Sequence, residues 1–255
     1  MGRAKVIAVA NQKGGVGKTT TAVNISASFA AAEKEVLLID ADPQGNTTSG
    51  VGVDRDGLET SIYDLFTGNL TLAELVMPTP LAHLSVVPSK VDLFGAEVEL
   101  VGRTGRESVL KDGVATLLDS YDYIVIDCPP ALGLLTLNAL TAAGSVLVPV
   151  QCEYYALEGL SQLLTTLELV RASLNPELAV EGILLTMHDP RNNLTKQVED
   201  EIRNHFGDKV YKTVIPRNVS LSEAPSFGKP IITYDIRSRG AQSYLSLARE
   251  VLEHV

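Results

Sequence analysis

A turn rich in glycine and lysine, residues 13–20 (KGGVGKTT), holds the side chains of this chain best suited to bind a phosphorylated ligand. Its three glycines let the backbone curl around an anion, so that successive amide N–H groups point at phosphate oxygens. Lys18 is placed to reach the β- and γ-phosphates, and the hydroxyl of Thr19 is placed to hold Mg²⁺. The common pattern G-x-x-x-x-G-K-[ST] needs glycine where this chain has Gln12. The turn therefore predicts an unusual phosphate-binding loop.

Lys13 is a second cation in this turn, at a position that the common pattern does not use. Its side chain can project over the phosphates or outward, and the flanking glycines would let a second copy of the chain approach closely. A lysine donated across such an interface would stabilise charge in the transition state, as an arginine finger does. A lysine that only faces solvent is the alternative. The residues expected around the phosphates are Lys13, Gly14, Gly15, Val16, Gly17, Lys18, Thr19 and Thr20.

Acidic residues end two of the apolar segments that we expect to form strands. Asp127 stands where a carboxylate can bind a water coordinated to Mg²⁺, and a carboxylate that only caps the following turn is the alternative. Asp40 and Asp42 lie two residues apart, so both point to the same side if the extended geometry persists. One can then orient an attacking water while the other touches the metal shell, because phosphoryl transfer needs positioning more than a strong base. For either residue, a plain polar turn is the alternative.

The elements that must position these groups follow from continuous apolar runs, which indicate strands buried on both faces of a parallel sheet. The runs are 6–10, 36–39, 123–126, 146–150 and 180–185. Helical periodicity lies between and after them, as in 22–29, 157–167 and 241–255, while the least regular part, 51–106, holds one further strand near 84–87. We predict one doubly wound, mostly parallel α/β domain over residues 1–255, with ligands at the carboxyl ends of its strands.

The composition suits one enzyme-sized domain, since 45% of the 255 residues are hydrophobic. The apolar runs are shorter than the roughly 18–20 residues that cross a bilayer, and a signal-peptide pattern is lacking, so no membrane partner is expected. Cys128 and Cys152 are too few for a disulfide framework and favour burial in a reducing cytoplasm.

Charge is unevenly distributed along the chain. The net charge of −10 argues against a general nucleic-acid coat, yet residues 209–239 carry six basic and two acidic side chains. A basic region on an acidic protein can meet DNA phosphates while the other faces repel them. The alternative is a solvated surface on which basic residues cluster by chance.

Three motifs together resemble the deviant phosphate loop, first switch and metal-binding strand of the ParA/MinD ATPases. They are KGGVGKTT (13–20), LIDADPQGN (38–46) and VIDCPP (125–130). Two longer segments, VQCEYYALEG (150–159) and IPRNVSLSEAPSFGKP (215–230), resemble the Soj-type chromosome-partition branch in particular. The match runs almost from end to end, and its motifs are long and ordered.

The resemblance implies a weak, cytoplasmic ATPase that uses ATP and Mg²⁺ and forms a face-to-face homodimer around two ATP molecules. Lys13 would reach the partner's nucleotide, and Gly14 would have to stay small for the dimer to close. Pro216 and Asn218 would lie against the adenine. The groups expected to serve hydrolysis are Lys13, Lys18, Asp40 and Asp42, and those expected at the metal are Thr19, Asp40 and Asp127.

The same resemblance implies that the ATP dimer binds double-stranded DNA without sequence preference, and so associates with the nucleoid. A ParB-type partner bound at centromere-like sites would stimulate hydrolysis and release the DNA. The expected DNA contacts are Arg191, Lys229, Arg237 and Arg239. One departure stands out, because Ser220 occupies a position where close relatives usually have a DNA-contacting arginine.

Two other functions fit parts of the sequence. A MinD-type membrane-cycling regulator would end in a basic amphipathic helix, whereas residues 247–255 carry one arginine and two glutamates. A nucleotide-gated regulator of replication initiation or transcription would use the same dimer switch to bind a partner protein. We therefore expect chromosome or plasmid partition, with this regulatory role as the alternative.

Overall fold

The computed structural model describes residues 2–253 and contains an eight-stranded sheet of order β3-β4-β2-β5-β1-β6-β7-β8. Every neighbouring pair is parallel except β3 with β4. The strands are β1 (Lys5–Val9), β2 (Val36–Asp40), β3 (Met77–Pro78), β4 (Leu84–Val87), β5 (Tyr123–Asp127), β6 (Ser145–Gln151), β7 (Ala179–His188) and β8 (Val210–Pro216). The mostly parallel α/β fold is therefore confirmed, and the five strands expected from apolar runs are present together with the further strand expected near 84–87.

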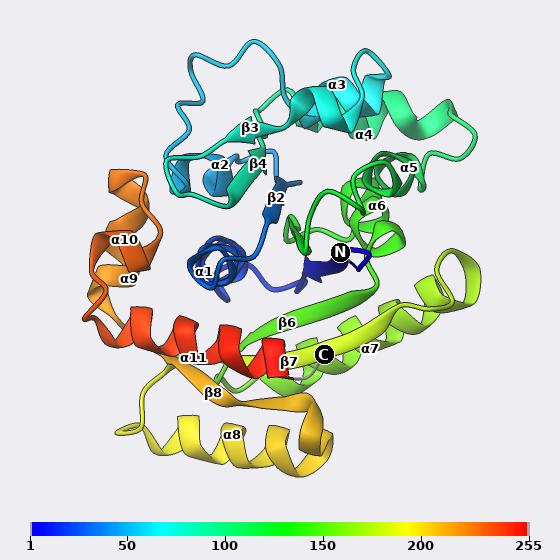
Figure 1. Cartoon of the computed structure of the whole chain (residues 1–255). Helices are drawn as coiled ribbons and strands as arrows, with labels where there is room; N and C mark the ends of the chain where they lie inside the picture. Colours follow the sequence, from blue (N-terminus) through cyan, green and yellow to red (C-terminus); the bar gives the residue numbers. More distant parts are fainter. Residues whose placement is uncertain (1, 254–255) are drawn as a thin grey trace.

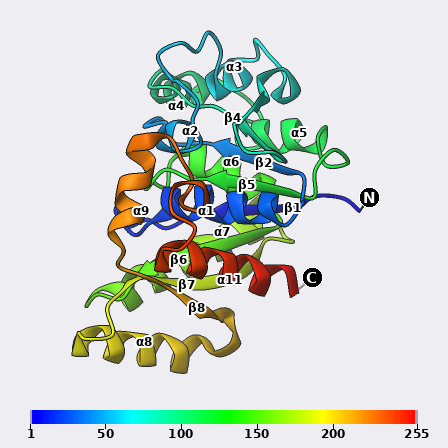
Figure 2. The same cartoon turned by 60° about the vertical axis from the view of Figure 1, so that its left-hand side comes forward.

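Helices cover both faces of the sheet (Figures 1 and 2). The α-helices are α1 (Lys18–Ala31), α2 (Asn46–Gly50), α3 (Ile62–Thr67), α4 (Leu93–Glu99), α5 (Val109–Ala115), α6 (Leu134–Ala142), α7 (Ala156–Ser173), α8 (Asn193–Phe206), α9 (Val219–Glu223), α10 (Ile231–Tyr234) and α11 (Arg239–Glu253). Short 3₁₀ turns are η1 (Leu72–Leu75), η2 (Leu100–Gly102), η3 (Gly207–Lys209) and η4 (Ala224–Phe227).

Alternate residues of each strand enter two different cores. In β1, Val6 and Ala8 pack with α3 to α8, whereas Ile7 and Val9 pack with α1, α9, α10 and α11. Successive side chains of a strand point to opposite faces, so an unbroken apolar run fills both cores at once. This burial on both faces fixes the carboxyl ends of the central strands, where the polar motifs lie.

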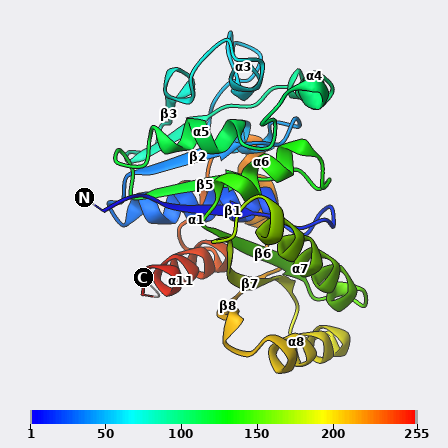
Figure 3. The ribbon, with the colours of Figure 1, turned by 90° about the vertical axis from the view of Figure 1, so that its right-hand side faces the viewer.

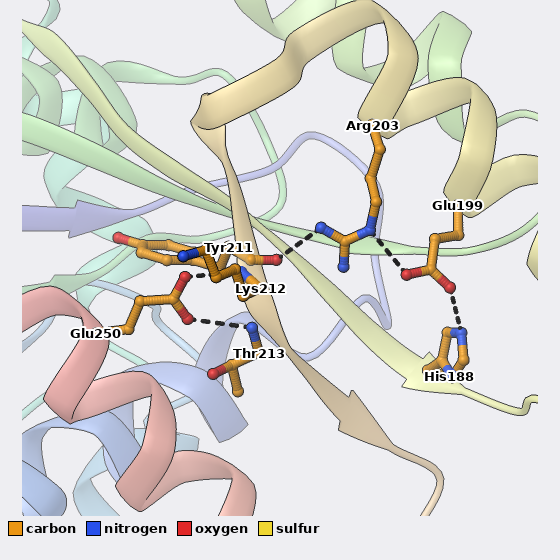
Figure 4. A network of polar contacts seen from close by, with 7 residues as sticks. All are labelled: His188, Glu199, Arg203, Tyr211, Lys212, Thr213 and Glu250. Carbon is orange, nitrogen blue, oxygen red and sulfur yellow. Dashed lines mark hydrogen bonds and ion pairs between the residues drawn. The ribbon is translucent and has the colours of Figure 1, made fainter.

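The elements outside the expectations include α8, β8 and the two-residue strand β3. The edge strand β8 mixes buried Val210 and Tyr211 with exposed Lys212, so its sequence lacks a continuous apolar run. Glu250 on α11 accepts hydrogen bonds from the backbone N–H groups of Lys212 and Thr213, at 2.7 and 3.1 Å (Figure 4). A side chain thus satisfies amides that an edge strand would otherwise expose. Within residues 2–253, no helix combines the length and the apolar character required to cross a membrane.

Gly182 in β7 provides a test of core packing. A Cβ atom at this position would lie 2.4 Å from the ring of buried Tyr211. Because overpacking costs about 1–3 kcal/mol, we expect Gly182→Ala to lower the free energy of unfolding by that amount. In α7, Gly159 has no described atom within 4 Å of such a Cβ, so Gly159→Ala should raise stability by about 0.5–1 kcal/mol. Urea unfolding of both variants, followed by circular dichroism, measures the two changes; equal effects would contradict the packing argument.

Candidate nucleotide-binding site

The phosphate loop connects β1 to α1 and is held in an open curve. Gly15 and Gly17 have φ angles of 75° and 89°, a left-handed conformation that favours glycine. Two side chains fix the loop and its approach from β1: the Thr186 hydroxyl donates to the carbonyl of Val16 at 2.8 Å, and the Asn11 amide donates to the carbonyl of Pro149 at 2.7 Å. The loop is therefore shaped before any ligand binds, with its amides available at the start of α1.

The two lysines of the loop have different surroundings. Lys18 is buried, and its Nζ donates to the carbonyl of Lys13 at 3.1 Å across the loop. Burial lowers the pKa of Lys18, while the nearby Asp127 carboxyl opposes that shift. Lys13 is half-buried and turns away, because its Nζ forms a 2.6 Å ion pair with Glu153 after β6. Of the two, only Lys18 thus points into the loop.

Two carboxylates meet at the carboxyl end of the sheet. Asp40 and Asp127 are partners in the register of β2 with β5, and both are fully buried. Burial raises the pKa of Asp127 to about 7, assisted by the charge of Asp40, and burial raises the pKa of Asp40 to about 6. Like charges held this close in a dry site cannot both ionise without a compensating cation.

Hydroxyl groups of α2 hold this acidic pair. The Thr47 hydroxyl donates to Asp127 Oδ2 at 2.6 Å, and the Thr48 hydroxyl donates to Asp40 Oδ2 at 2.6 Å. Among the residues the structure describes, Asp127 Oδ1 is buried and lacks a hydrogen-bond partner. An unpaired buried carboxylate oxygen beside Thr19 fits a Mg²⁺ shell, since Mg²⁺ takes one or two carboxylates and completes its sphere with water and phosphate. Within residues 2–253, no group of three or more His, Cys, Asp or Glu could hold a metal without such help.

Asp42 lies beyond the end of β2, next to the loop. Its Oδ1 accepts from the backbone N–H of Gln44 at 2.9 Å, and its side chain lines a cavity of about 290 Å³ with Gly15, Lys18 and Pro130. Its own N–H donates to Asp40 Oδ1 at 3.2 Å. The two aspartates therefore have different surroundings: Asp40 is enclosed by Thr48 and the backbone, while Asp42 faces the space over the loop.

A second cavity, of about 480 Å³, adjoins the first. Pro216 and Asn218, expected against the adenine, line it after β8, and both cavities share Gly17, Thr20 and Met187. The side chain of Asn218 also caps α9 by accepting from the N–H of Leu221 at 3.1 Å. A cleft of this size and mostly apolar lining suits a planar base beside a phosphate site.

The expected DNA contacts come from two regions of the surface. Arg191, in the turn between β7 and α8, is exposed and forms a two-pronged ion pair with Asp189, at 3.0 Å for each contact. Hydrogen bonds from Arg191 lower the pKa of Asp189 to about 2. The other expected contacts lie exposed between η4 and the start of α11: Lys229, Arg237 and Arg239. Ser220 is half-buried and lies 3.5 Å from Asp235.

The turn that carries Arg191 is fixed at its base. His188, the last residue of β7, lies 2.7 Å from Glu199 on α8, and Arg203 donates both to Glu199 and to the carbonyl of Tyr211 (Figure 4). The residue before it, Met187, has a positive φ of 50° and lines both cavities. The second cavity and the turn that carries Arg191 therefore both lie at the carboxyl end of β7.

Several residues at the site were not expected from the sequence. The hydroxyls of Thr47, Thr48 and Thr186, the side chain of Met187 and the carboxylate of Glu153 all contact or line it. For Glu153, Thr186 and Met187 the available signal was their position just beyond a predicted strand end, whereas Thr47 and Thr48 lie on the short helix α2 and carried no such signal. Fold and site together define a phosphate-loop nucleotide-binding protein whose loop carries a second lysine.

Comparisons with known proteins name the family. A family model described as an AAA domain matches residues 4–180. The chain is 58% identical over 247 residues to the sporulation initiation inhibitor protein Soj of Bacillus subtilis, with 97% of this chain and 98% of that protein covered. It is 57% identical over 249 residues to the chromosome partitioning protein ParA of Myxococcus xanthus, with 98% and 88% covered. The chain belongs to the ParA/Soj family of chromosome-partitioning ATPases, as its motifs predicted.

Solved structures agree with this fold. A protein named cobyrinic acid a,c-diamide synthase from Mycobacterium smegmatis, crystallised with ADP and magnesium, is 38% identical with a TM-score of 0.86, covering 98% of this chain and 95% of that one. A putative plasmid partition protein from Borrelia burgdorferi, bound to AMPPNP, is 25% identical with a TM-score of 0.83, covering 99% and 100%. Both similarities extend over the whole chain.

The buried acidic pair predicts how stability depends on pH without ligand. The pKa values of Asp40 and Asp127 are raised in the fold from 3.8 to about 6 and about 7. The native state thus holds protons that the unfolded chain has lost, so the free energy of unfolding should fall as pH rises from about 4 to 7. In Asp127→Asn, this decrease in the free energy of unfolding should be smaller by roughly 1–3 kcal/mol.

Urea unfolding at pH 5 and pH 7.5, without nucleotide or Mg²⁺, measures the effect. The matched control is Asp119→Asn, which changes an exposed carboxylate and should follow the wild type. A wild-type pH dependence that survives intact in Asp127→Asn would place the responsible protons elsewhere.

Proposed function

We propose that this ATPase works as an ATP-dependent dimer that binds DNA non-specifically and partitions a chromosome or plasmid with a ParB-type partner. Its nucleotide is ATP, taken with Mg²⁺. The observation that carries the proposal is the continuous cleft, in which the cavity over a preformed phosphate loop and a base pocket share Gly17, Thr20 and Met187, while Asp42 lines the phosphate side. The 53–58% identity to partition ATPases supports the cellular role.

Within one copy, the residues divide the work by position. Lys18 gives up its contact with the Lys13 carbonyl and binds the β- and γ-phosphates. Thr19, Asp127 and Asp40 would hold Mg²⁺, which neutralises phosphate charge when bound. Asp42 faces the space over the loop and orients the attacking water. Pro216 and Asn218 line the cavity that receives the adenine.

Lys13 acts across the dimer in this proposal. In a single copy it is paired with Glu153, so that it lies away from its own loop. Gly14 is exposed, and no described atom lies within 4 Å of where its Cβ would stand, so a partner has room to close over the loop. Lys13 would then leave Glu153 and stabilise the charge on the partner's nucleotide.

DNA binding would use Arg191 together with Lys229, Arg237 and Arg239 of both copies. These side chains are exposed and follow β7 and β8, two neighbouring strands, although the chain as a whole is acidic. Phosphate would compete with Asp189 for Arg191, and bidentate pairing suits both acceptors. Binding of this kind would bring the cytoplasmic protein onto the nucleoid, where a DNA-bound ParB-type partner stimulates hydrolysis.

Substitution of the two lysines should impair different steps. We expect Lys18→Ala to lose ATP binding, because it removes the phosphate contact inside the loop. Lys13→Ala should bind ATP normally but lose dimerisation and turnover, while Asp42→Ala should bind ATP, accumulate as a dimer and lose turnover. Nucleotide titration, light scattering and phosphate release measure the three properties. Equal loss of ATP binding in both lysine variants, or a monomeric Asp42→Ala with ATP, would contradict these roles.

The salt dependence of DNA binding tests the basic surface. Each neutralised phosphate contributes a slope of roughly −0.9 to log affinity against log salt, so Arg191→Ala should flatten the slope by about two units in the two-fold dimer. Ser220→Arg should steepen it by a similar amount. The matched control is Lys111→Ala on α5, an exposed lysine at the opposite, amino end of the strands. DNA binding is measured across a salt series with a non-hydrolysable ATP analogue. An unchanged slope in Ser220→Arg would show that this position does not face DNA.

A further inference from the structure

An apolar stripe runs along α4 and η2 on the surface. Val91, Phe94, Val98 and Val101 follow one another at spacings of three, four and three residues, which places them on one helical face. All four are exposed, from 53% for Phe94 to 76% for Val98. Surface residues of this kind are common singly, but a contiguous row marks an interaction site.

The stripe begins near the carboxyl edge of the sheet, the edge that also carries the nucleotide site. Val91 lies only four residues beyond the carboxyl end of β4. On α4, the carboxylate of Glu97 lies against Gly133, in the turn that also contains half-exposed Leu132 and Pro130 of the phosphate-loop cavity. In Figure 3, α4 is on the same side of the molecule as the turn before α6. The apolar row therefore borders the face over which the proposed dimer closes.

A second exposed apolar feature borders the same face on its other side. Tyr154 and Tyr155 follow β6 directly, are 76% and 67% exposed, and pack edge to face with ring centroids 5.1 Å apart. They come immediately after Glu153, the partner of Lys13. In the sheet order, β4 lies on one side of β1 and β6 on the other, with the phosphate loop between them.

We infer that, in the nucleotide-dependent dimer, the stripe Val91–Phe94–Val98–Val101 of one copy packs on Tyr154 and Tyr155 of the other. This inference rests on the proposed function, because Lys13 can reach a partner's nucleotide only if the two-fold axis passes beside the phosphate loops. In this dimer the axis would run between the stripe and the tyrosines, so that each feature of one copy faces the other feature of its partner and the contact occurs twice.

The interface also needs this apolar area. A stable dimer buries about 800 Å² on each partner, and its centre is apolar, with aromatic side chains enriched. Gly14 and Gly15, in contrast, offer no side chains to bury. Stripe and tyrosines would supply one apolar contact on each side of the two nucleotides and exclude water from them.

Charge exchange tests the pairing. We expect Val98→Lys and Tyr154→Glu each to weaken the dimer about tenfold or more, because each places a charge in an apolar contact. The double variant should recover most of the affinity, because the introduced lysine of one copy would meet the introduced glutamate of the other. The matched control is Leu169→Lys on α7, which is 65% exposed and lies 13 residues into that helix, away from the nucleotide face. Sedimentation with a non-hydrolysable ATP analogue and Mg²⁺ measures the dimer, and nucleotide titration should show unchanged ATP binding throughout.

The outcomes separate this inference from the proposal beneath it. A wild-type chain that stays monomeric with nucleotide contradicts the proposed dimer itself. A wild-type dimer that Val98→Lys leaves intact, or a double variant as weak as the single ones, overturns the pairing alone. Variants that dimerise normally but lose stimulation by a DNA-bound partner protein would assign the stripe to that partner and also overturn it.

Discussion

The site is organised around two carboxylates that the fold forces together. Parallel pairing of β2 with β5 sets Asp40 beside Asp127 at the end of strands that are apolar on both faces, where water cannot screen them. Thr47 and Thr48 each donate a hydroxyl to one of them. Burial raises the pKa values of both carboxyls, so the pair holds protons more readily than exposed aspartates do, and a metal-nucleotide complex would displace them. The short helix α2 is thereby tied to the charge state of the strand ends.

The sequence was sufficient to predict those strands that are buried on both faces of the sheet. Strands apolar on both faces leave unbroken runs, and these located five of the eight strands within two residues at either end in most cases, while a sixth was expected near 84–87. Edge elements were missed for a physical reason: β8 mixes buried and exposed residues, and α8 buries only Thr195, Val198 and Ile202, so neither carries a continuous apolar run. The strand β3 has only two residues and carries no pattern at all.

The residue types that form the site could also be predicted from the sequence, because a glycine-rich turn with lysine and an aspartate at a strand end together serve few other functions. Contacts between residues far apart in the sequence could not be predicted. The pairing of Lys13 with Glu153 spans 140 positions, and that of Thr186 with the loop spans 170. Such partners depend on strand order, which local periodicity does not encode. Asp189, in contrast, lies two residues from Arg191, yet a bidentate pair needs a turn whose shape only the folded chain supplies.

The ion pair between Lys13 and Glu153 has a consequence for how such a protein would behave in a cell. A copy that keeps this lysine on its own glutamate lacks the second cation at its own phosphates. In the proposed dimer each copy supplies the second cation to the phosphates of the other. The hydrolysis rate per molecule would therefore rise with the local concentration of copies rather than with the supply of ATP. Sparse copies would keep their ATP bound without hydrolysing it, and copies gathered on a surface would hydrolyse it. The rate of ATP hydrolysis would therefore depend on where along that surface the copies are gathered.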